Sequence, residues 1–141
     1  MLKKIITTIY FIYVIFMTSF GEVYGTTEWD CAKNTGSFTR SADCTISGSD
    51  GHIAVANTLK IVGSNEDMNN LITITAATNK RHFYLNHANA KLILRYLKLV
   101  GGDVSSYSID RDRFGGSIFI YKKGGGELNL YSSIVFNNKA E

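Results

Sequence analysis

The sequence predicts an all-β solenoid that follows an N-terminal signal peptide. After residue 26, short runs rich in β-branched and aromatic residues alternate at period two, with Gly, Asn, Asp and Ser between them. The chain has no proline, and no window in this part shows a capped apolar stripe at helical spacing. Apolar pairs and Gly or Asn corners recur in the same order about every 36–39 residues, which is typical of a repeat architecture.

Residues 1–25 have the layout of a secretory signal peptide. Lys3 and Lys4 give a positive start, a nearly unbroken apolar run covers 5–20, and small residues follow. We expect cleavage after Gly25, with a cut after Gly21 as the alternative. The run is shorter than the roughly 20 residues that span a bilayer, so a cleaved peptide is favoured over an uncleaved membrane anchor.

Residues 26–48 are predicted to form a disulfide-bearing N-terminal cap. Cys31 and Cys44 are the only cysteines, and an even count in an exported chain favours a disulfide. Two thiols without a nearby histidine make at most half a zinc site. Trp29, beside Cys31, is expected to pack over the open end of the solenoid, where strand edges and apolar core need a cover.

The remainder of the chain, 49–141, is predicted to form the coils of the solenoid. Each expected strand is three to five residues long, with Gly, Asn, Asp or Ser before the next. The expected strands, in order, are 53–55, 59–61, 71–75, 82–85, 92–94, 97–100, 118–121, 128–130 and 134–136.

Stacked coils should place equivalent residues above one another. The spacing leaves open whether one repeat holds one long coil or two short ones. The alignments that suggest the repeat are Leu59–Gly63 with Leu97–Gly101, the pair Ile53/Val55 with Leu92/Leu94 and then Leu128/Leu130, Phe83 with Phe119, and Gly101–Gly102 with Asn137–Asn138.

Two short motifs resemble a known repeat family. Gly115, Gly116, Ser117 and Ile118, followed by Val135, Phe136, Asn137 and Asn138, resemble the paired GGA[ILV] and FxxN motifs of the polymorphic outer membrane protein repeat. Ser117 stands where the family has Ala, and Val135 stands where it has Phe, with Phe136 one place late.

The resemblance implies a right-handed parallel β-helix of the pectin-lyase-like class over residues 44–141. Gly115 and Gly116 would then let the backbone pack closely at a corner before a buried Ile118 and Ile120. The asparagines would bond backbone groups of neighbouring coils. Because no cap follows Asn138, the chain is expected to be the N-terminal fragment of a longer β-helix, open at its C-terminal end.

The motifs that suggest chemistry have simpler structural interpretations. Asp110 and Asp112 each lie beside an arginine, which favours a neutralised surface loop over a catalytic carboxylate pair. His82 and His87 are badly spaced for a shared metal and are expected at the surface or at corners. The run 124–126 lacks the lysine of a phosphate-binding loop and is expected to be a loop tip. We therefore predict no catalytic residue, metal or cofactor.

The formal net charge of +3 is scattered over the chain, which argues against a nucleic-acid partner. The resemblance implies a non-catalytic, adhesin-like protein that displays loops such as 101–114 and 122–126. It would be secreted or held at the cell surface (the outer membrane in a bacterium), with a cell-surface protein or a carbohydrate as candidate partner. The alternatives are the N-terminal piece of a polysaccharide-cleaving β-helix enzyme, or a small β domain on a membrane anchor at 5–20.

Overall fold

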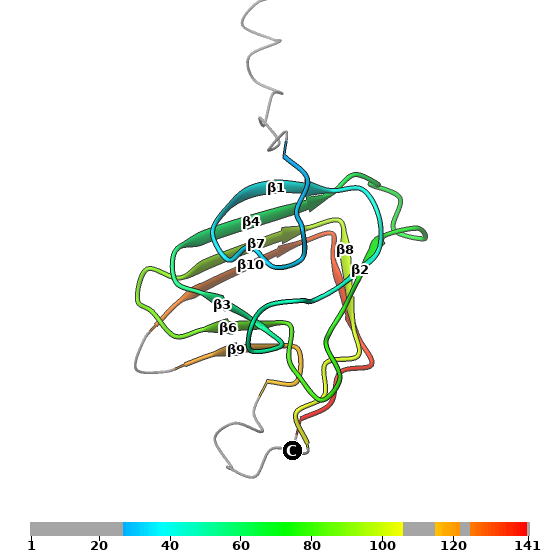
Figure 1. Ribbon diagram of the computed structural model, residues 1–141. Helices are drawn as coiled ribbons and strands as arrows, with labels where there is room; N and C mark the ends of the chain where they lie inside the picture. Colours follow the sequence, from blue (N-terminus) through cyan, green and yellow to red (C-terminus); the bar gives the residue numbers. More distant parts are fainter. Residues whose placement is uncertain (1–26, 106–114, 122–124, 141) are drawn as a thin grey trace, which may run out of the picture.

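The computed structural model describes residues 27–105, 115–121 and 125–140, and this part of the chain is all-β (Figure 1). The predicted signal peptide and the pair Asp110 and Asp112 lie outside the described residues. The strands are β1 (Gly36–Arg40), β2 (Cys44–Thr45), β3 (Ile53–Val55), β4 (Thr58–Gly63), β5 (Ile72–Thr75), β6 (Phe83–Leu85), β7 (Lys91–Arg95), β8 (Leu97–Val100), β9 (Ile118–Ile120), β10 (Glu127–Tyr131) and β11 (Ile134–Phe136).

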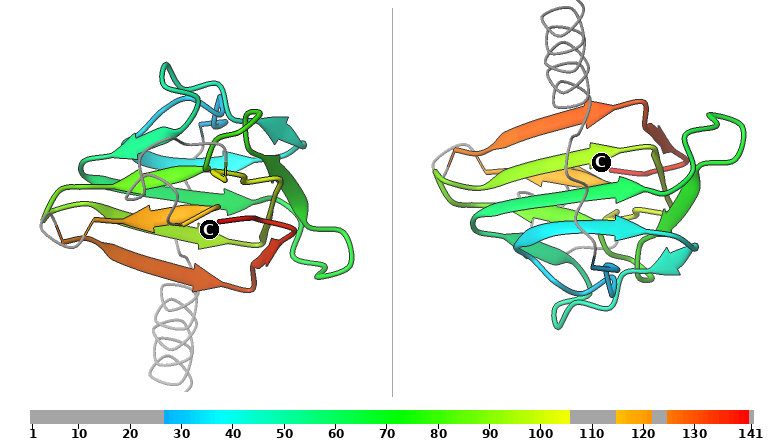
Figure 2. Two further views of the ribbon diagram at one scale, coloured as in Figure 1. Left: turned by 90° about the horizontal axis from the view of Figure 1, so that it is seen from below. Right: turned by 90° about the horizontal axis from the view of Figure 1, so that it is seen from above.

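The strands form three parallel sheets that the chain visits in turn. Sheet A has the order β1-β4-β7-β10, sheet B the order β2-β5-β8-β11, and sheet C the order β3-β6-β9. Each strand from β1 to β8 pairs with the strand three positions later in the chain. Figures 1 and 2 show the strands of each sheet side by side, from cyan to orange along sheet A. One repeat therefore contributes one strand to each sheet.

The core lies between the sheets and is built from stacked columns of apolar side chains. Successive residues of a strand point to opposite faces, so every second residue faces inward. In sheet A, Leu59 pairs in register with Leu92, and Ile61 with Leu94; all four side chains are fully buried. Burial of one such side chain stabilises the fold by about 1.5–3 kcal/mol.

The pairing corrects part of the predicted repeat register. Gly101–Gly102 and Asn137–Asn138 do follow paired strands β8 and β11, and Leu92/Leu94 pair with Leu128/Leu130 as predicted. The alignment of Leu59–Gly63 with Leu97–Gly101 is wrong, because the first segment lies in sheet A and the second in sheet B. Two further alignments are also wrong: Ile53 and Val55 pair with Phe83 and Leu85, and Phe119 pairs with Tyr84.

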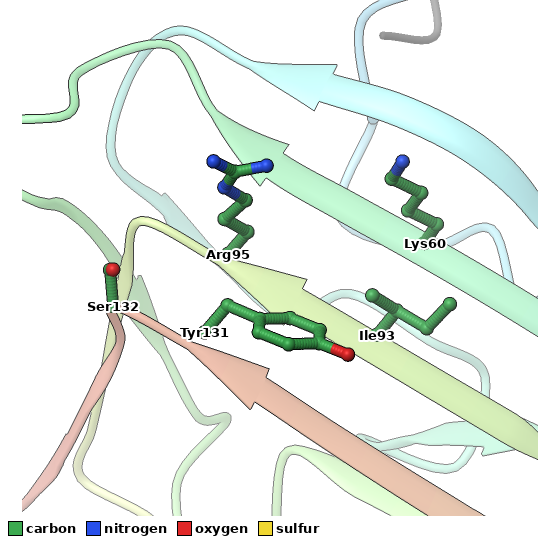
Figure 3. Close-up of a pocket in the computed structure, with 5 residues that line it drawn as sticks. All are labelled: Lys60, Ile93, Arg95, Tyr131 and Ser132. Carbon is green, nitrogen blue, oxygen red and sulfur yellow. The ribbon is translucent and has the colours of Figure 1, made fainter. Parts of the chain in front are cut away.

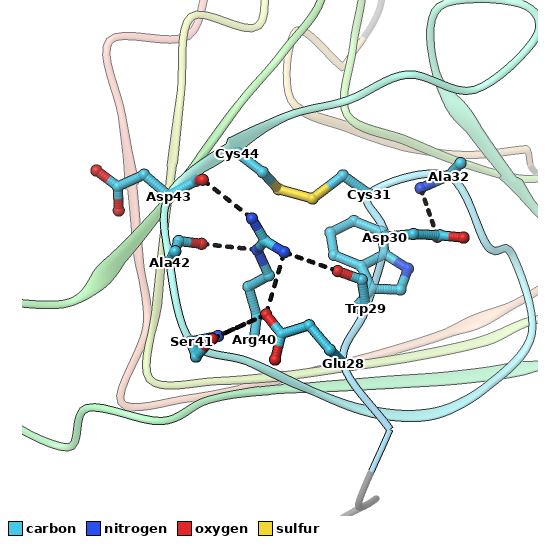
Figure 4. Close-up of polar contacts among 10 residues, drawn as sticks. All are labelled: Glu28, Trp29, Asp30, Cys31, Ala32, Arg40, Ser41, Ala42, Asp43 and Cys44. Atoms are coloured by element: carbon cyan, nitrogen blue, oxygen red, sulfur yellow. Dashed lines mark hydrogen bonds and ion pairs between the residues drawn. A yellow bond between two sulfur atoms is a disulfide. The ribbon is translucent and has the colours of Figure 1, made fainter.

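The N-terminal end of the stack is closed. Glu28 forms a parallel bridge with Thr39, and the Trp29 amide donates to the Thr39 carbonyl at 2.8 Å, so the edge of β1 is occupied. The Trp29 indole is fully buried and stacks on Phe83 with ring centroids 6.2 Å apart. The predicted disulfide between Cys31 and Cys44 is present beside it (Figure 4).

The other end of the described stack leaves apolar side chains in contact with solvent. Ile118 is only partly buried and Ile120 is 38% exposed, so the prediction that both are buried is wrong. Their partners one strand earlier, Phe83 and Leu85, are fully buried. The difference arises because no described strand stacks on the outer side of β9.

Candidate functional site

The outer face of sheet A carries a groove of about 410 Å³ (Figure 3). Lys60 comes from β4, Ile93 and Arg95 from β7, and Tyr131 from β10; Ser132 completes the lining. These strand residues alternate with the buried columns, so the period of two that builds the core also places these side chains outside. The volume lies within the roughly 300–1,000 Å³ typical of ligand pockets.

The lining has two cationic groups and no carboxylate. The nearest acid in the strand register is Glu127, which pairs with Lys91 in the same sheet. Its carboxylate accepts from Lys91 Nζ at 3.0 Å and from Asn129 Nδ2 at 2.7 Å. The hydrogen bond from Asn129, together with Lys91, lowers the pKa of Glu127. The lining therefore contributes two basic side chains, and the carboxylate of Glu127 is engaged by Lys91 and Asn129.

Arg95 is held in place by the residue that follows it. Its guanidinium lies 4.7 Å from the centroid of the Tyr96 ring and donates from Nη2 to the Tyr96 hydroxyl at 2.9 Å. Tyr96 sits at the corner between β7 and β8 with a φ of 55°. A stacked and hydrogen-bonded guanidinium has fewer accessible rotamers, which lowers the entropy lost when a ligand binds it.

The corner beside Tyr131 is also fixed. Ser132 adopts a φ of 45°, and the Ser133 hydroxyl donates to the Tyr131 carbonyl at 3.0 Å and accepts from the Leu97 amide at 3.2 Å. These bonds join the corner after β10 to the strand β8. The Tyr131 side chain is 54% exposed and lies on the same side of the sheet as Lys60 and Ile93 (Figure 3).

The groove offers groups that can bind a ligand through non-covalent contacts. Lysine and arginine attract anions, an exposed tyrosine ring presents an apolar face and a polar tip, and serine and tyrosine hydroxyls donate or accept hydrogen bonds. This combination suits non-covalent recognition of a ligand that carries both anionic groups and an apolar ring face.

A second polar cluster lies at the N-terminal end and has a structural role (Figure 4). Arg40 donates to the carbonyls of Trp29, Ala42 and Asp43 and forms an ion pair with Glu28 at 3.1 Å. Because every one of these partners belongs to the surrounding loops, the guanidinium joins the segment before β1 to the turn before β2.

His82 is fully buried, so it does not lie at the surface; it sits in the bend directly before β6, which is a corner position as predicted. Its Nε2 is 3.0 Å from the Ile74 carbonyl, and its Nδ1 is 3.0 Å from the Ser117 hydroxyl. The carbonyl can only accept, so Nε2 carries the proton and the Ser117 hydroxyl donates to Nδ1. Burial lowers the pKa of His82 to about 4, and the ring is neutral at pH 7.

The motif residues lie at two neighbouring corners. Gly115 has a φ of 66°, and a side chain on Gly116 would collide with the backbone of Lys139. Asn138 Oδ1 accepts from the Gly102 amide at 2.7 Å, and its Nδ2 donates to the Leu99 carbonyl at 3.2 Å. The expected close packing at Gly115–Gly116 and the expected asparagine bond to a neighbouring strand are both present.

Val135 and Phe136 of the second motif lie in β11 and are exposed, while Asn137 turns the next corner with a φ of 51°. Ser117 is buried against His82. The motif residues thus occupy strand and corner positions and do not converge on a common cavity among the described residues.

The remaining sequence candidates do not form a site in the described part. His87 is exposed, and His52 packs edge-on against Tyr84 with centroids 5.8 Å apart. Within residues 27–105, 115–121 and 125–140, no group of three His, Cys, Asp or Glu side chains could hold a metal ion. Gly125 and Gly126 have positive φ values, whereas Gly124 lies outside the described residues.

Sequence reasoning missed the groove. The lining residues are spread over 72 positions of the chain, from Lys60 to Ser132, and converge only through the register of β4, β7 and β10. The signal that would have found them is the alignment of 58–62 with 91–95, whereas the predicted repeat aligns 59–63 with 97–101.

Comparisons with known proteins give no identification: no family model, no curated protein and no solved structure matches the chain. In the described part of the chain, none of the structure forms a helix long and apolar enough to cross a membrane.

Proposed function

We propose that this chain is an exported, adhesin-like protein that binds its partner non-covalently on the outside of a right-handed parallel β-helix. The observation that carries the proposal is the stack of three parallel sheets whose outer face presents a groove lined by Lys60, Arg95 and Tyr131. A stack of this kind supplies a stiff support, and binding residues on stiff strands keep their geometry better than residues on loops.

Two features support the assignment to the β-helix class. The chain passes through sheets A, B and C in turn, and each strand pairs in parallel with the strand three positions later. The Gly115–Gly116 corner and Asn138 make the close backbone contacts that stacked coils need. Both features are compatible with the polymorphic outer membrane protein repeat that the motifs resemble.

The disulfide supports export. A bridge between Cys31 and Cys44 persists in oxidising compartments and is rare in a reducing cytosol. Together with the signal-peptide layout of residues 1–25, it favours a product outside the cell or on its surface.

The test is the fate of the full-length chain in an exporting host. We would recover product from the medium and from the membrane fraction, and measure its intact mass with and without reduction before alkylation. We expect a species that starts near Thr26, takes up two alkyl groups only after reduction, and binds to intact cells. A species that retains Met1 in the membrane fraction with free thiols would overturn the proposal.

A further inference from the structure

We propose that a second copy of this chain docks on the open end of the stack, with β10 of one copy antiparallel to β10 of the other across a twofold axis. The axis passes through Asn129, the middle residue of β10. The inference goes beyond the proposed function, because it concerns the partner that covers this end and not the ligand of the groove.

The open end presents apolar side chains together with strand edges. In the described part of the chain, no strand pairs with the outer edges of β9, β10 and β11, and Figure 2 shows β10 at the edge of sheet A. The side chains that continue the buried columns there include Ile120, Leu130 and Val135, which are 38%, 41% and 45% exposed. An unpaired edge of this kind is a template for another strand.

These edges lack the residues that usually keep edge strands apart. The sequences of β9, β10 and β11 are IFI, ELNLY and IVF, without lysine or proline. The other end of the stack is closed by the Glu28–Thr39 bridge and by the buried Trp29. The open end of one copy therefore meets the open end of another, and such an isologous contact closes at two copies.

The backbone of β10 shows which of its groups face the free edge. The Glu127 amide donates to the Ala90 carbonyl at 2.8 Å, and the Tyr131 carbonyl accepts from the Tyr96 amide at 3.2 Å, so both ends of the strand bond toward β7. Along a strand, the backbone groups of successive residues point to alternate sides. The amides and carbonyls of the two leucines of β10 therefore point to the free edge.

A twofold axis through Asn129 joins these groups in pairs. It places Leu128 opposite Leu130 of the second copy, and each such pair exchanges both backbone bonds, as a hydrogen-bonded antiparallel pair does. Both leucines also continue the inward columns, because they pair in register with the buried Leu92 and Leu94. One register thus satisfies the free backbone groups and extends the apolar core across the contact.

The remaining strands of the open end also match under this axis. An axis perpendicular to sheet A reverses the order of the sheets around the stack, so β9 faces β11 of the second copy. Each of these strands has three residues, all of them apolar. The only charged residue of β10, Glu127, faces Tyr131 of the second copy and not its own counterpart. Like charges directly opposite destabilise an antiparallel pair, and this register avoids them.

The dimer joins the two copies of sheet A into one sheet whose outer faces lie on the same side. Two grooves would then open in the same direction. A partner with repeated binding sites could engage both grooves, which raises the overall affinity through effective concentration.

The first experiment measures the solution mass of the disulfide-bonded product of the full-length chain by sedimentation equilibrium at several concentrations. We expect a reversible equilibrium of monomer and dimer and no larger species. Leu130→Lys places an inward charge at the contact and should weaken the dimer at least about tenfold, which corresponds to about 1.4 kcal/mol. The matched control Met68→Lys adds the same charge at an exposed apolar residue in the loop between β4 and β5, and should stay within about twofold. Equal unfolding midpoints in dilute solution would show that both variants are folded.

Introduced cysteines test the register. Asn129→Cys should form a disulfide between copies, because the two residues at the axis are a non-hydrogen-bonded pair with Cα atoms about 4.5 Å apart. Tyr131→Cys is the control: this position is more exposed than Asn129, yet it lies about 13 Å along the strand from its own counterpart and should not cross-link. A mixture of Glu127→Cys with Tyr131→Cys should cross-link between the two variants.

Four results would overturn the inference: a monomer at every concentration, species larger than a dimer, an equal loss in Met68→Lys, or cross-linking of Tyr131→Cys as fast as that of Asn129→Cys. A monomer would assign the open end to another part of this chain or to a different protein. These measurements do not depend on export or on binding to cells, so the dimer and the proposed function can fail separately.

Discussion

Ser117 and His82 show how a departure from a motif can be compensated by another residue. Ser117 occupies the place where the resembling family has Ala, and its hydroxyl is the partner of the buried His82 Nδ1. A buried histidine nitrogen without a partner costs free energy, so the serine and the histidine stabilise the fold as a pair. The sequence does not predict this pairing, because the two residues are 35 positions apart.

Substitution of Ser117 by Ala should destabilise the protein by about 1–3 kcal/mol, because it leaves His82 Nδ1 buried without a donor. The measurement is the urea unfolding midpoint at pH 7. Ser64→Ala at an exposed position is the matched control and should change the free energy of unfolding by less than about 0.5 kcal/mol. Equal midpoints for the two variants would contradict the assigned role of the hydroxyl.

The buried His82 should also make stability depend on pH. Its pKa falls from an ordinary 6.5 to about 4 on folding, so between these values the unfolded chain binds a proton that the folded chain does not. Stability is therefore complete above pH 6.5 and declines as the pH falls toward 4. The loss is on the order of 3 kcal/mol, at 1.36 kcal/mol per pKa unit.

Urea unfolding at several pH values between 7 and 4 measures this decline. His82→Gln, which has no charge to gain, should remove most of it. Burial also lowers the pKa of His52, which contributes with the same sign, so His52→Gln should leave most of the decline in place. An unchanged pH dependence in His82→Gln would show that another group is responsible.

At the scale of elements, the period-two pattern predicts a strand well where apolar and polar residues clearly alternate along the run. All nine expected runs correspond to strands β3 to β11, with bounds that differ by at most two residues. The sequence did not predict β1 and β2. β1 reads GSFTR and holds a single apolar residue, Phe38, and β2 has two residues, so neither has a period to detect.

The glycines of the corners are explained only by the stacked neighbours. Gly116 would place a side chain against the backbone of Lys139, whereas Gly101 has space and needs only its φ of 78°. We expect Gly116→Ala to cost about 1–3 kcal/mol or more through overpacking. Gly101→Ala should cost about 1 kcal/mol, because the site has space for the added methyl group. The cost then comes only from holding an alanine in a left-handed backbone conformation. Thermal or urea unfolding compares them, and a larger effect at Gly101 would contradict the packing argument.

At the scale of the whole molecule, burial changes along the axis of the stack. Leu99 in β8 is fully buried, whereas Val135, its register partner in β11, is 45% exposed. The closed N-terminal end combines the disulfide, Trp29 and the occupied β1 edge. In a stack where each strand mainly contacts its neighbours, stability is a sum of local contributions, so it should fall from the closed end toward β9, β10 and β11.

Hydrogen exchange of the folded chain tests this gradient. Amides of β4 and β7, which have strands on both sides, should exchange only through opening of most of the stack. Amides of β10 and β11 should exchange through a smaller opening that exposes few buried side chains.

Two substitutions test the same gradient. Leu99→Ala should lower the free energy of unfolding by about 2–5 kcal/mol, as in a fully packed core. Val135→Ala should lower it by less than about 1 kcal/mol, because the valine side chain is already about half exposed to water. Uniform protection across the three sheets, or equal costs at these two positions, would mean that the described stack unfolds as one cooperative unit. The exposed side chains at its far end would then be supported by contacts that the register of the strands does not reveal.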